Sequence, residues 1–306
     1  MSRIVLFAVL FASLASLPTY AQKEAVLTQA LVTVEGKAQG DVNLAALTIS
    51  VDDHKQPLTD FKPIDPAKTQ VALLMDSGLR VSVGRELDEL RGFVRSLPDG
   101  VEVMVGSMQY GLVRADQPFT TNHEAAAQAL HLPQGLAGGS ASPYLCLSDF
   151  VKNWPEGAKT GGQSMARIVL MISNGVDPYN GSTSIMNQDS PYVAAAVTDA
   201  QRAGVAVYSI YYGDAGIGGP QASFSGQSYL EQLGHGTGGQ LFYEGNRNPV
   251  SLKPFLDDFR KLLGETYVAS FVVPPVDSRH ELVRVKVSGS RMKVHAPEAV
   301  RPGNRE

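Results

Sequence analysis

Oxygen-bearing side chains follow two of the most apolar runs in the chain. Asp76-Ser77-Gly78-Leu79-Arg80 comes directly after the run Val71 to Met75, and Ser173-Asn174-Gly175-Val176-Asp177 comes directly after Ile168 to Ile172. A third polar stretch, Gly138-Gly139-Ser140-Ala141-Ser142, has no such run before it. Carboxylate, amide and hydroxyl oxygens are the ligands that hard cations such as Mg²⁺ prefer. The same groups also serve as hydrogen-bonding anchors for a protein partner.

Other chemistries lack their patterns. The six His residues have no zinc-binding spacing, and no G-x-S-x-G motif marks a nucleophile. Cys146 lies in the apolar context Tyr144-Leu145-Cys146-Leu147, which is typical of an inert buried thiol. Gly234, Gly236 and Gly239 match G-x-G-x-x-G, but a helix precedes them and a strand follows, the reverse of a dinucleotide site. The sequence therefore predicts a protein that is not an enzyme; a hydrolase with an unrecognised site stays as a distant alternative.

Residues 68–264 alternate buried strands with amphipathic helices. The apolar runs at 71–75 and 168–172 are continuous, as in strands buried on both faces, and 101–105 and 205–211 are further predicted strands. Helical spacing follows in three stretches, whose apolar positions are Leu87, Leu90, Val94 and Leu97; Val193, Val197 and Ala200; and Leu252, Phe255, Leu256, Phe259, Leu262 and Leu263. This alternation predicts an α/β fold with a doubly wound, mostly parallel sheet and helices on both faces. In such a sheet ligands bind beyond the carboxyl ends of the strands.

The two ends of the mature chain show no helical period. Residues 22–67 and 265–297 contain short β-prone runs separated by polar turns, such as 30–34, 47–51, 267–273 and 282–287. Because an isolated hairpin is marginally stable, we expect the two segments to pair into one β-rich flank. Residues 298–306 are predicted to form a tail.

The first 21 residues have the pattern of a cleaved secretory signal. Arg3 precedes an apolar run at 4–14, and small residues end the segment at Ala21. We therefore expect an exported protein, periplasmic or secreted. Its mature part holds 25 basic and 30 acidic residues, a net charge of −5, with no clustered basic face for nucleic acid and no transmembrane segment.

The three polar loops, in this order and at this spacing, resemble those of von Willebrand factor type A (vWA) domains. Thr237-Gly238-Gly239 before a predicted strand resembles a late segment of the same domains, and the β-rich ends resemble a group of exported bacterial vWA-related proteins. The resemblance implies a metal-ion-dependent adhesion site with a D-x-S-x-S first loop, a Thr in the second and an Asp in the third.

This chain departs from that pattern at most ligand positions. Gly78 and Arg80 stand where the two Ser residues are expected, Ser140 stands for the Thr, and Asn174 stands for the Asp. Asp76 and Ser140 are thus the remaining weak candidates for holding Mg²⁺, and we expect no tightly bound metal or other cofactor. We further expect Arg80 to neutralise Asp76, or Asp177 in the neighbouring loop.

The predicted function is non-catalytic binding of a protein partner through the loop rim at the carboxyl ends of the strands. Its residues are Asp76, Ser77, Arg80, Ser140, Asn174 and Asp177. The alternative from another class is a structural or assembly subunit of an envelope complex, in which the β flank makes the contacts. The partner's identity is left open by the sequence.

Overall fold

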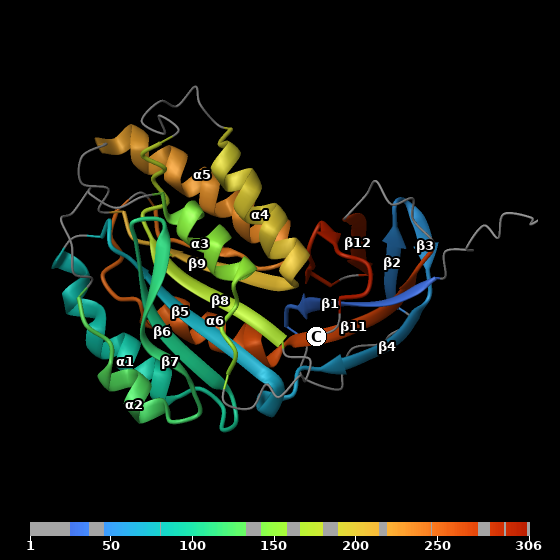
Figure 1. Ribbon diagram of the computed structural model, residues 1–306, viewed down its shortest axis with the longest axis horizontal. Helices are drawn as coiled ribbons and strands as arrows, with labels where there is room; N and C mark the ends of the chain where they lie inside the picture. Colours follow the sequence, from blue (N-terminus) through green and yellow to red (C-terminus); the bar gives the residue numbers. More distant parts are fainter. Residues whose placement is uncertain are drawn as a thin grey trace, which may run out of the picture.

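A computed structural model gives the structure of the chain (Figure 1). It describes residues 25–36, 46–79, 81–132, 142–157, 166–179, 189–213, 219–245, 247–274, 282–290 and 292–304. These residues form an α/β domain built on a central sheet and, beside it, a flank made only of strands.

The central sheet has six strands in the order β10-β9-β8-β5-β6-β7. All neighbours are parallel except β6 and β7, which form an antiparallel hairpin at one edge. The bounds are β5 Thr69–Asp76, β6 Glu102–Gln109, β7 Leu112–Thr120, β8 Ala166–Ser173, β9 Val205–Tyr211 and β10 Leu241–Phe242. The sheet is thus doubly wound and mostly parallel, which confirms the predicted fold class.

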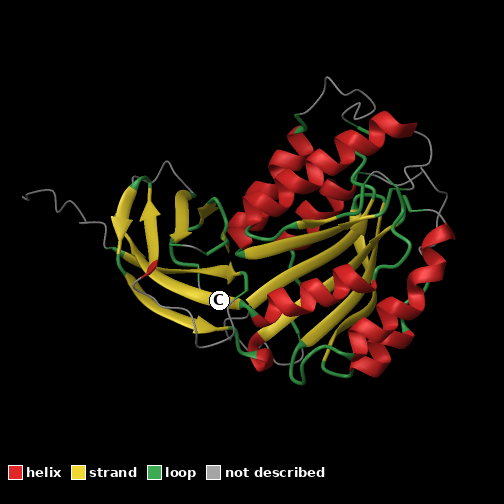
Figure 2. Cartoon of the chain, turned by 180° about the vertical axis from the view of Figure 1, so that it is seen from behind, coloured by secondary structure: helices red, strands yellow, loops and turns green. Residues whose placement is uncertain are grey.

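Helices cover both faces of this sheet (Figure 2). One face packs against α1 Leu87–Arg95, α2 His123–Gln128 and α6 Lys253–Gly264, and the other against α3 Pro143–Lys152, α4 Pro191–Ala203 and α5 Gly219–Thr237. The side chains of β5 alternate between the two cores: Val71 and Leu73 join the first, Ala72 and Leu74 the second. Continuous apolar runs are therefore required in the central strands, because neither face reaches water.

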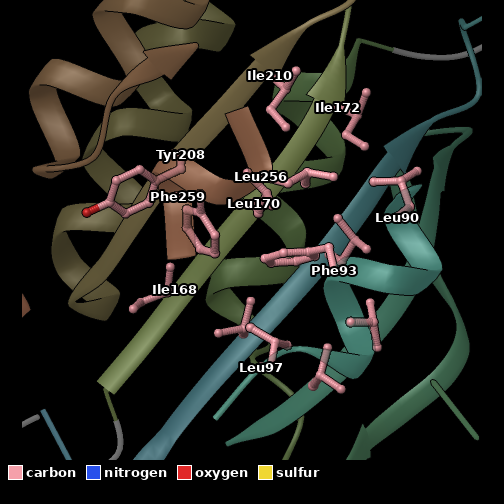
Figure 3. Packing of buried hydrophobic residues seen from close by; sticks show 14 of the residues in the cluster. Leu90, Phe93, Leu97, Ile168, Leu170, Ile172, Tyr208, Ile210, Leu256 and Phe259 are labelled. Carbon is pink, nitrogen blue, oxygen red and sulfur yellow. The ribbon is translucent and has the colours of Figure 1, made fainter. Parts of the chain in front are cut away.

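The first core is built from helical stripes that meet the sheet (Figure 3). Leu90 and Phe93 of α1 and Leu256 and Phe259 of α6 are buried against the sheet, and the Phe93 and Phe259 rings meet edge to face with centroids 5.8 Å apart. The spacing of three residues within each pair puts its two members on one helix face. Two short 3-10 turns, η2 Pro66–Lys68 and η3 Val81–Glu86, precede and follow β5.

The flank joins the two ends of the chain, as the sequence predicts. One sheet has the order β13-β1-β11-β4 and the other β14-β12-β2-β3. The bounds are β1 Val26–Val34, β2 Leu47–Val51, β3 His54–Gln56, β4 Leu58–Pro63, β11 Thr266–Val273, β12 Val283–Gly289, β13 Val294–His295 and β14 Ala299–Val300. The ends form two four-stranded sheets that share a core of Ala30, Phe271, Ile49, Val51 and Val285. The last strand, β14, lies within residues 298–306, which the sequence predicts as a tail, and it pairs with β12.

The flank sits at the amino end of the parallel strands (Figure 1). β11 begins directly after α6, and the hydroxyls of Thr33 in β1 and Tyr208 in β9 lie 3.0 Å apart. The carboxyl ends of the parallel strands point away from the flank. The rim and the flank are therefore opposite ends of the molecule.

Candidate interaction site at the carboxyl edge of the sheet

The site lies where the winding of the sheet reverses. β5 sits between β6, to which the chain goes first, and β8, to which it goes later. At such a switch point the loops after the two central strands turn to opposite faces and leave a place for a ligand. Asp76 is the last residue of β5 and Ser173 the last of β8, so the first and third predicted loops converge here.

Asp76 is buried, and both its carboxyl oxygens are hydrogen-bonded. The Ser173 hydroxyl donates to Oδ2 at 2.6 Å and the Gly78 N–H donates to Oδ1 at 2.7 Å. Ser173 Oγ in turn accepts from the Gly175 N–H at 2.9 Å. Burial raises the pKa of Asp76, although these two hydrogen bonds act in the opposite direction. The carboxyl is thus held by neutral donors.

The remaining first-loop residues close a tight turn. The Leu79 N–H donates to the Asp76 carbonyl at 3.1 Å, and the Ser77 N–H donates to the Met108 carbonyl of β6 at 3.0 Å. Ser77 is itself buried. Arg80 and Ser140, two of the predicted site residues, lie outside the described residues. The expectation that Arg80 neutralises an acid of this site therefore stays a prediction.

Asn174 and Asp177 stabilise their own loop. Asn174 Oδ1 accepts from the Val176 N–H at 2.9 Å. Asp177 is fully buried; its Oδ2 accepts from the Ser190 hydroxyl at 2.7 Å and its Oδ1 from the Tyr179 N–H at 3.2 Å. Ser190 also caps α4, accepting from the first-turn N–H groups of that helix. The loop after β8 is therefore tied to the start of α4.

The third loop packs against α5 without space for a side chain. Gly175 has φ +68°, and a Cβ there would overlap the Gly226 carbonyl of α5, just as one on Gly226 would overlap the Asn174 carbonyl. The Tyr144 hydroxyl of α3 donates to the Gly175 carbonyl at 2.8 Å, and burial raises the pKa of Tyr144 well above its ordinary value. The sequence placed Ser173 in the third loop and Tyr144 beside Cys146 without predicting a role for either in the site, and Ser190 was not named. The one usable signal was Ser190 before Pro191, a helix-start pattern.

The described residues do not fit an Mg²⁺ site of the vWA kind. Mg²⁺ needs close to six oxygens in octahedral geometry. Here Gly78 contributes an N–H where a hydroxyl ligand is expected, and both carboxyl oxygens of Asp76 accept internal hydrogen bonds. Asn174, which stands for the third-loop Asp, carries no negative charge. Nor does the described part of the chain bring three or more His, Cys, Asp or Glu side chains together around a possible metal.

Exposed apolar side chains gather around this edge instead. The structure describes eight large exposed hydrophobic residues, and five of them lie at the carboxyl edge: Tyr110, Tyr179, Tyr243 and Val250 in loops, and Leu112 at the start of β7. Tyr110 follows β6, Tyr179 follows β8 and Tyr243 follows β10. We call these three residues the tyrosine rim; they are 70%, 59% and 56% exposed. With about 4.8 Å between neighbouring strands, the four steps from β10 to β6 give this rim a width of about 19 Å.

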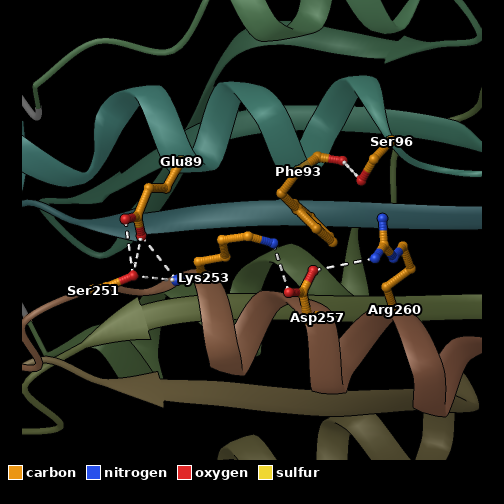
Figure 4. A network of polar contacts seen from close by, with 7 residues as sticks. All are labelled: Glu89, Phe93, Ser96, Ser251, Lys253, Asp257 and Arg260. Carbon is orange, nitrogen blue, oxygen red and sulfur yellow. Dashed lines mark hydrogen bonds and ion pairs between the residues drawn. The ribbon is translucent and has the colours of Figure 1, made fainter.

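The loops that carry the rim are fixed by hydrogen bonds. Tyr110 and Gly111 both have positive φ, 53° and 80°, and form the tight turn of the β6–β7 hairpin. The Gln227 side chain of α5 donates to the Gly245 carbonyl at 2.6 Å, close to Tyr243. Before α6, the Glu89 carboxylate of α1 accepts from the Ser251 hydroxyl and the Lys253 N–H, each at 2.8 Å (Figure 4). A carboxylate at the start of a helix is favourable, so α1 anchors the loop of Val250.

Comparison with known proteins finds similarity in solved structures alone. No protein-family model and no curated protein matches the sequence. A vWA protein from Catenulispora acidiphila is 11% identical with a TM-score of 0.45, over 92% of this chain and 74% of its own. An aerotolerance-related membrane protein from Bacteroides fragilis is 11% identical with a TM-score of 0.43, over 64% and 98%. The ArnB paralog VWA2 from Sulfolobus acidocaldarius is 9% identical with a TM-score of 0.39, over 90% and 76%.

The architecture of the α/β domain is vWA-like. It has the doubly wound strand order, with one antiparallel edge strand and an Asp at the carboxyl end of the first strand of its central sheet. Among the described residues no helix is both long and apolar enough to cross a membrane.

Proposed function

We propose that this chain is an exported, non-catalytic module that binds a protein partner through the carboxyl-edge rim and does so without a metal ion. The observation that carries the proposal is the tyrosine rim. Tyr side chains offer a large, rigid contact area with a polar tip, and exposed aromatic residues are enriched where proteins bind one another. The rim's breadth suits a protein surface better than a small molecule.

The fixed conformation of the loops also supports a protein-binding surface at the rim. The loops beneath the rim are tied to α1, α4 and α5 by Glu89, Ser190 and Gln227. A surface that is already ordered loses little conformational entropy when it binds. The polar residues Asp76, Asn174 and Asp177 then act as internal supports of the loops, and the tyrosines act as the contacts.

Independence from metal is supported by the hydrogen bonds of Asp76. In the vWA adhesion site a divalent cation links the domain to a carboxylate of its partner. Here neutral donors are hydrogen-bonded to both carboxyl oxygens of Asp76, and burial raises its pKa, which disfavours the charged form. Calorimetry with Mg²⁺ and Mn²⁺ should therefore detect no binding tighter than millimolar. The double variant Arg80→Ser, Asn174→Asp should gain affinity, because it restores a hydroxyl and a carboxylate. Tight Mg²⁺ binding by the unmodified chain would overturn this part.

The partner test compares the two ends of the molecule. In a crosslinking pulldown from envelope extract, the triple variant Tyr110→Ser, Tyr179→Ser, Tyr243→Ser should lose the captured protein. The control Val26→Ser, Leu27→Ser removes exposed apolar groups from the flank (each 41% exposed) and should retain it. The reverse result would favour a structural subunit that makes its contacts through the flank.

Export and the lack of catalysis have separate tests. Export is supported by the charged start, the apolar run and the small residues that end at Ala21. Sequencing of the protein from its native envelope should begin at or near Gln22; a cytoplasmic protein that keeps Met1 would refute export. Turnover in a screen of ester and peptide substrates, abolished by a point substitution, would refute the non-catalytic assignment.

A further inference from the structure

A large cleft lies between the α/β domain and the flank, away from the rim. Its volume is about 930 Å³, at the upper end of the range for ligand pockets. Ala194, Val197, Thr198 and Gln201 of α4 form one wall. The other wall comes from β12, which lies beside the end of α4 in Figure 1.

The wall formed by β12 carries cations on one face. Arg284 and Lys286 are exposed, whereas Val283 and Val285, which alternate with them, are buried in the flank. The strand register continues this face: Lys286 lies opposite Ser50 of β2, and Ser50 lies opposite Lys55 of β3. Two lysines and a hydroxyl thus form one row across three strands.

The acids at the cleft are already engaged. Asp53 lies 3.6 Å from the Arg284 guanidinium, and Glu298 lies 3.0 Å from His235 of α5. Within the part of the chain that the structure describes, Lys286 and Lys55 have no ion pair. The Arg284–Asp53 pair is long and its side chains are 78% and 85% exposed, so it exchanges partners readily.

We propose that this cleft binds an extended acidic peptide segment. Residues i and i+2 of a strand point the same way and are about 6.7 Å apart. Arg284 and Lys286 have this spacing, and so do acidic side chains at alternate positions of an extended peptide. A peptide lying along β12 therefore presents two carboxylates to the two cations, while the small side chains of α4 contact its other face. The site is independent of the rim.

The test measures anisotropy of a fluorescent peptide with the purified full chain. The probe is an eight-residue peptide of alternating Glu and Thr with blocked ends. We expect binding that weakens between 50 and 300 mM NaCl, as exposed charge pairs are screened. Lys286→Gln should weaken it about twofold to fivefold, and Lys286→Glu should weaken it further. Thr198→Trp, which fills the cleft without changing charge, should abolish it.

Matched controls decide the outcome. Lys68→Glu makes the same charge change at an exposed site outside the cleft and should leave affinity unchanged. A peptide of the same composition with its Glu residues consecutive should bind more weakly, because its carboxylates do not match the alternate cations. The proposal is overturned if the alternating peptide does not bind, or if Lys68→Glu weakens it as much as Lys286→Glu. It is equally overturned if the consecutive peptide, or an acidic polysaccharide such as polyuronate, binds as tightly.

Discussion

The rim and the flank hold their acidic groups in opposite ways. At the rim, Asp76 is surrounded by hydroxyl and N–H donors, and its pKa is raised by burial. In the flank, the Glu35 carboxylate lies 2.8 Å from the Lys293 ammonium and 2.7 Å from the His295 ring. Burial raises the pKa of Glu35, but the hydrogen bonds from these two partners outweigh it and hold the pKa below its ordinary value. The flank compensates the charge of Glu35 with Lys293 and His295, whereas the rim surrounds Asp76 with neutral donors and disfavours its charged form.

The exposed surfaces of the rim and the flank differ in the same way, with uncharged groups at the rim and charged pairs in the flank. The rim exposes tyrosines on fixed loops, while the edge strand β4 of the flank carries the ion pair of Asp60 and Lys62, 2.7 Å apart. Charged residues on an edge strand oppose pairing with another chain. The rim therefore favours contact with a partner, whereas the edge strand of the flank opposes pairing with another chain.

Among substitutions at the rim, the largest loss of stability should come from a glycine with positive φ. Gly175 at the rim has φ +68° and a Cβ there would overlap α5, whereas Gly36 in the flank has φ +74° and open space around it. We expect Gly175→Ala to lower the free energy of unfolding by about 3 kcal/mol, from backbone strain together with overpacking. Gly36→Ala should cost about 1 kcal/mol, from backbone strain alone. Urea denaturation measures both; equal losses would mean that α5 does not fix the third loop.

The strands of the central sheet were predictable because burial on both faces demands continuous apolar runs, as at Val71 to Met75. The edge strand β7 was not predicted. Its residues are exposed or half-buried except for Phe119, and its register with β6 shifts at two places, so no regular alternation marks it. That the ends pair was predictable from their composition. Their division into two sheets was not, because it depends on which strands meet.

The convergence of Asp76 and Asn174 at one edge of the sheet was predictable, because ligand-binding loops follow the carboxyl ends of parallel strands. The hydrogen bonds that determine the chemistry of these two residues could not be predicted from the sequence. Ser173 and Asp76 are 97 residues apart, and their contact depends on the register between β5 and β8. The tyrosines of the rim were missed as well, since a single exposed Tyr has no sequence pattern; only the common edge makes them a group.

The second prediction concerns how stability changes with pH at the rim. Because the pKa of Asp76 is raised in the folded state, the native protein binds more protons than the unfolded chain above about pH 4. Its contribution is therefore fully present below that pH and is lost as pH rises through the folded pKa. Asp76→Asn should remove this slope and leave stability at pH 7 equal or higher. Strong destabilisation at pH 7 in thermal melts would show that the negative charge is needed.

The third prediction is the opposite slope in the flank. The pKa of Glu35 is lowered on folding, so its contribution is present above the unfolded value and is lost as pH falls through the folded one. Glu35→Gln should lower the free energy of unfolding at pH 7 by about 0.5 to 1 kcal/mol, the usual range for a partly exposed ion pair. The difference from the unmodified chain should vanish near pH 2. A difference that persists there would assign the effect to packing.

The smallest effect on stability should come from the tyrosines of the rim. Tyr243 is 56% exposed, whereas Tyr267 in the flank is 2% exposed and stacks on Phe61 with ring centroids 4.5 Å apart. Tyr243→Ser should change the free energy of unfolding by less than about 0.5 kcal/mol, as is usual for surface substitutions. Tyr267→Ser should cost about 3 kcal/mol or more, because it leaves a cavity.

The same pair of variants separates binding from folding. If the rim is the contact surface, Tyr243→Ser should weaken partner capture while its urea midpoint stays unchanged. Tyr267→Ser should lower the midpoint and yet capture the partner as long as it is folded. A surface residue that stabilises nothing in its own chain but is needed for capture acts on the partner directly. If Tyr243→Ser instead lowered the midpoint as much as Tyr267→Ser, the ring would be a support of its own loop, and the rim would lose one of its three contacts.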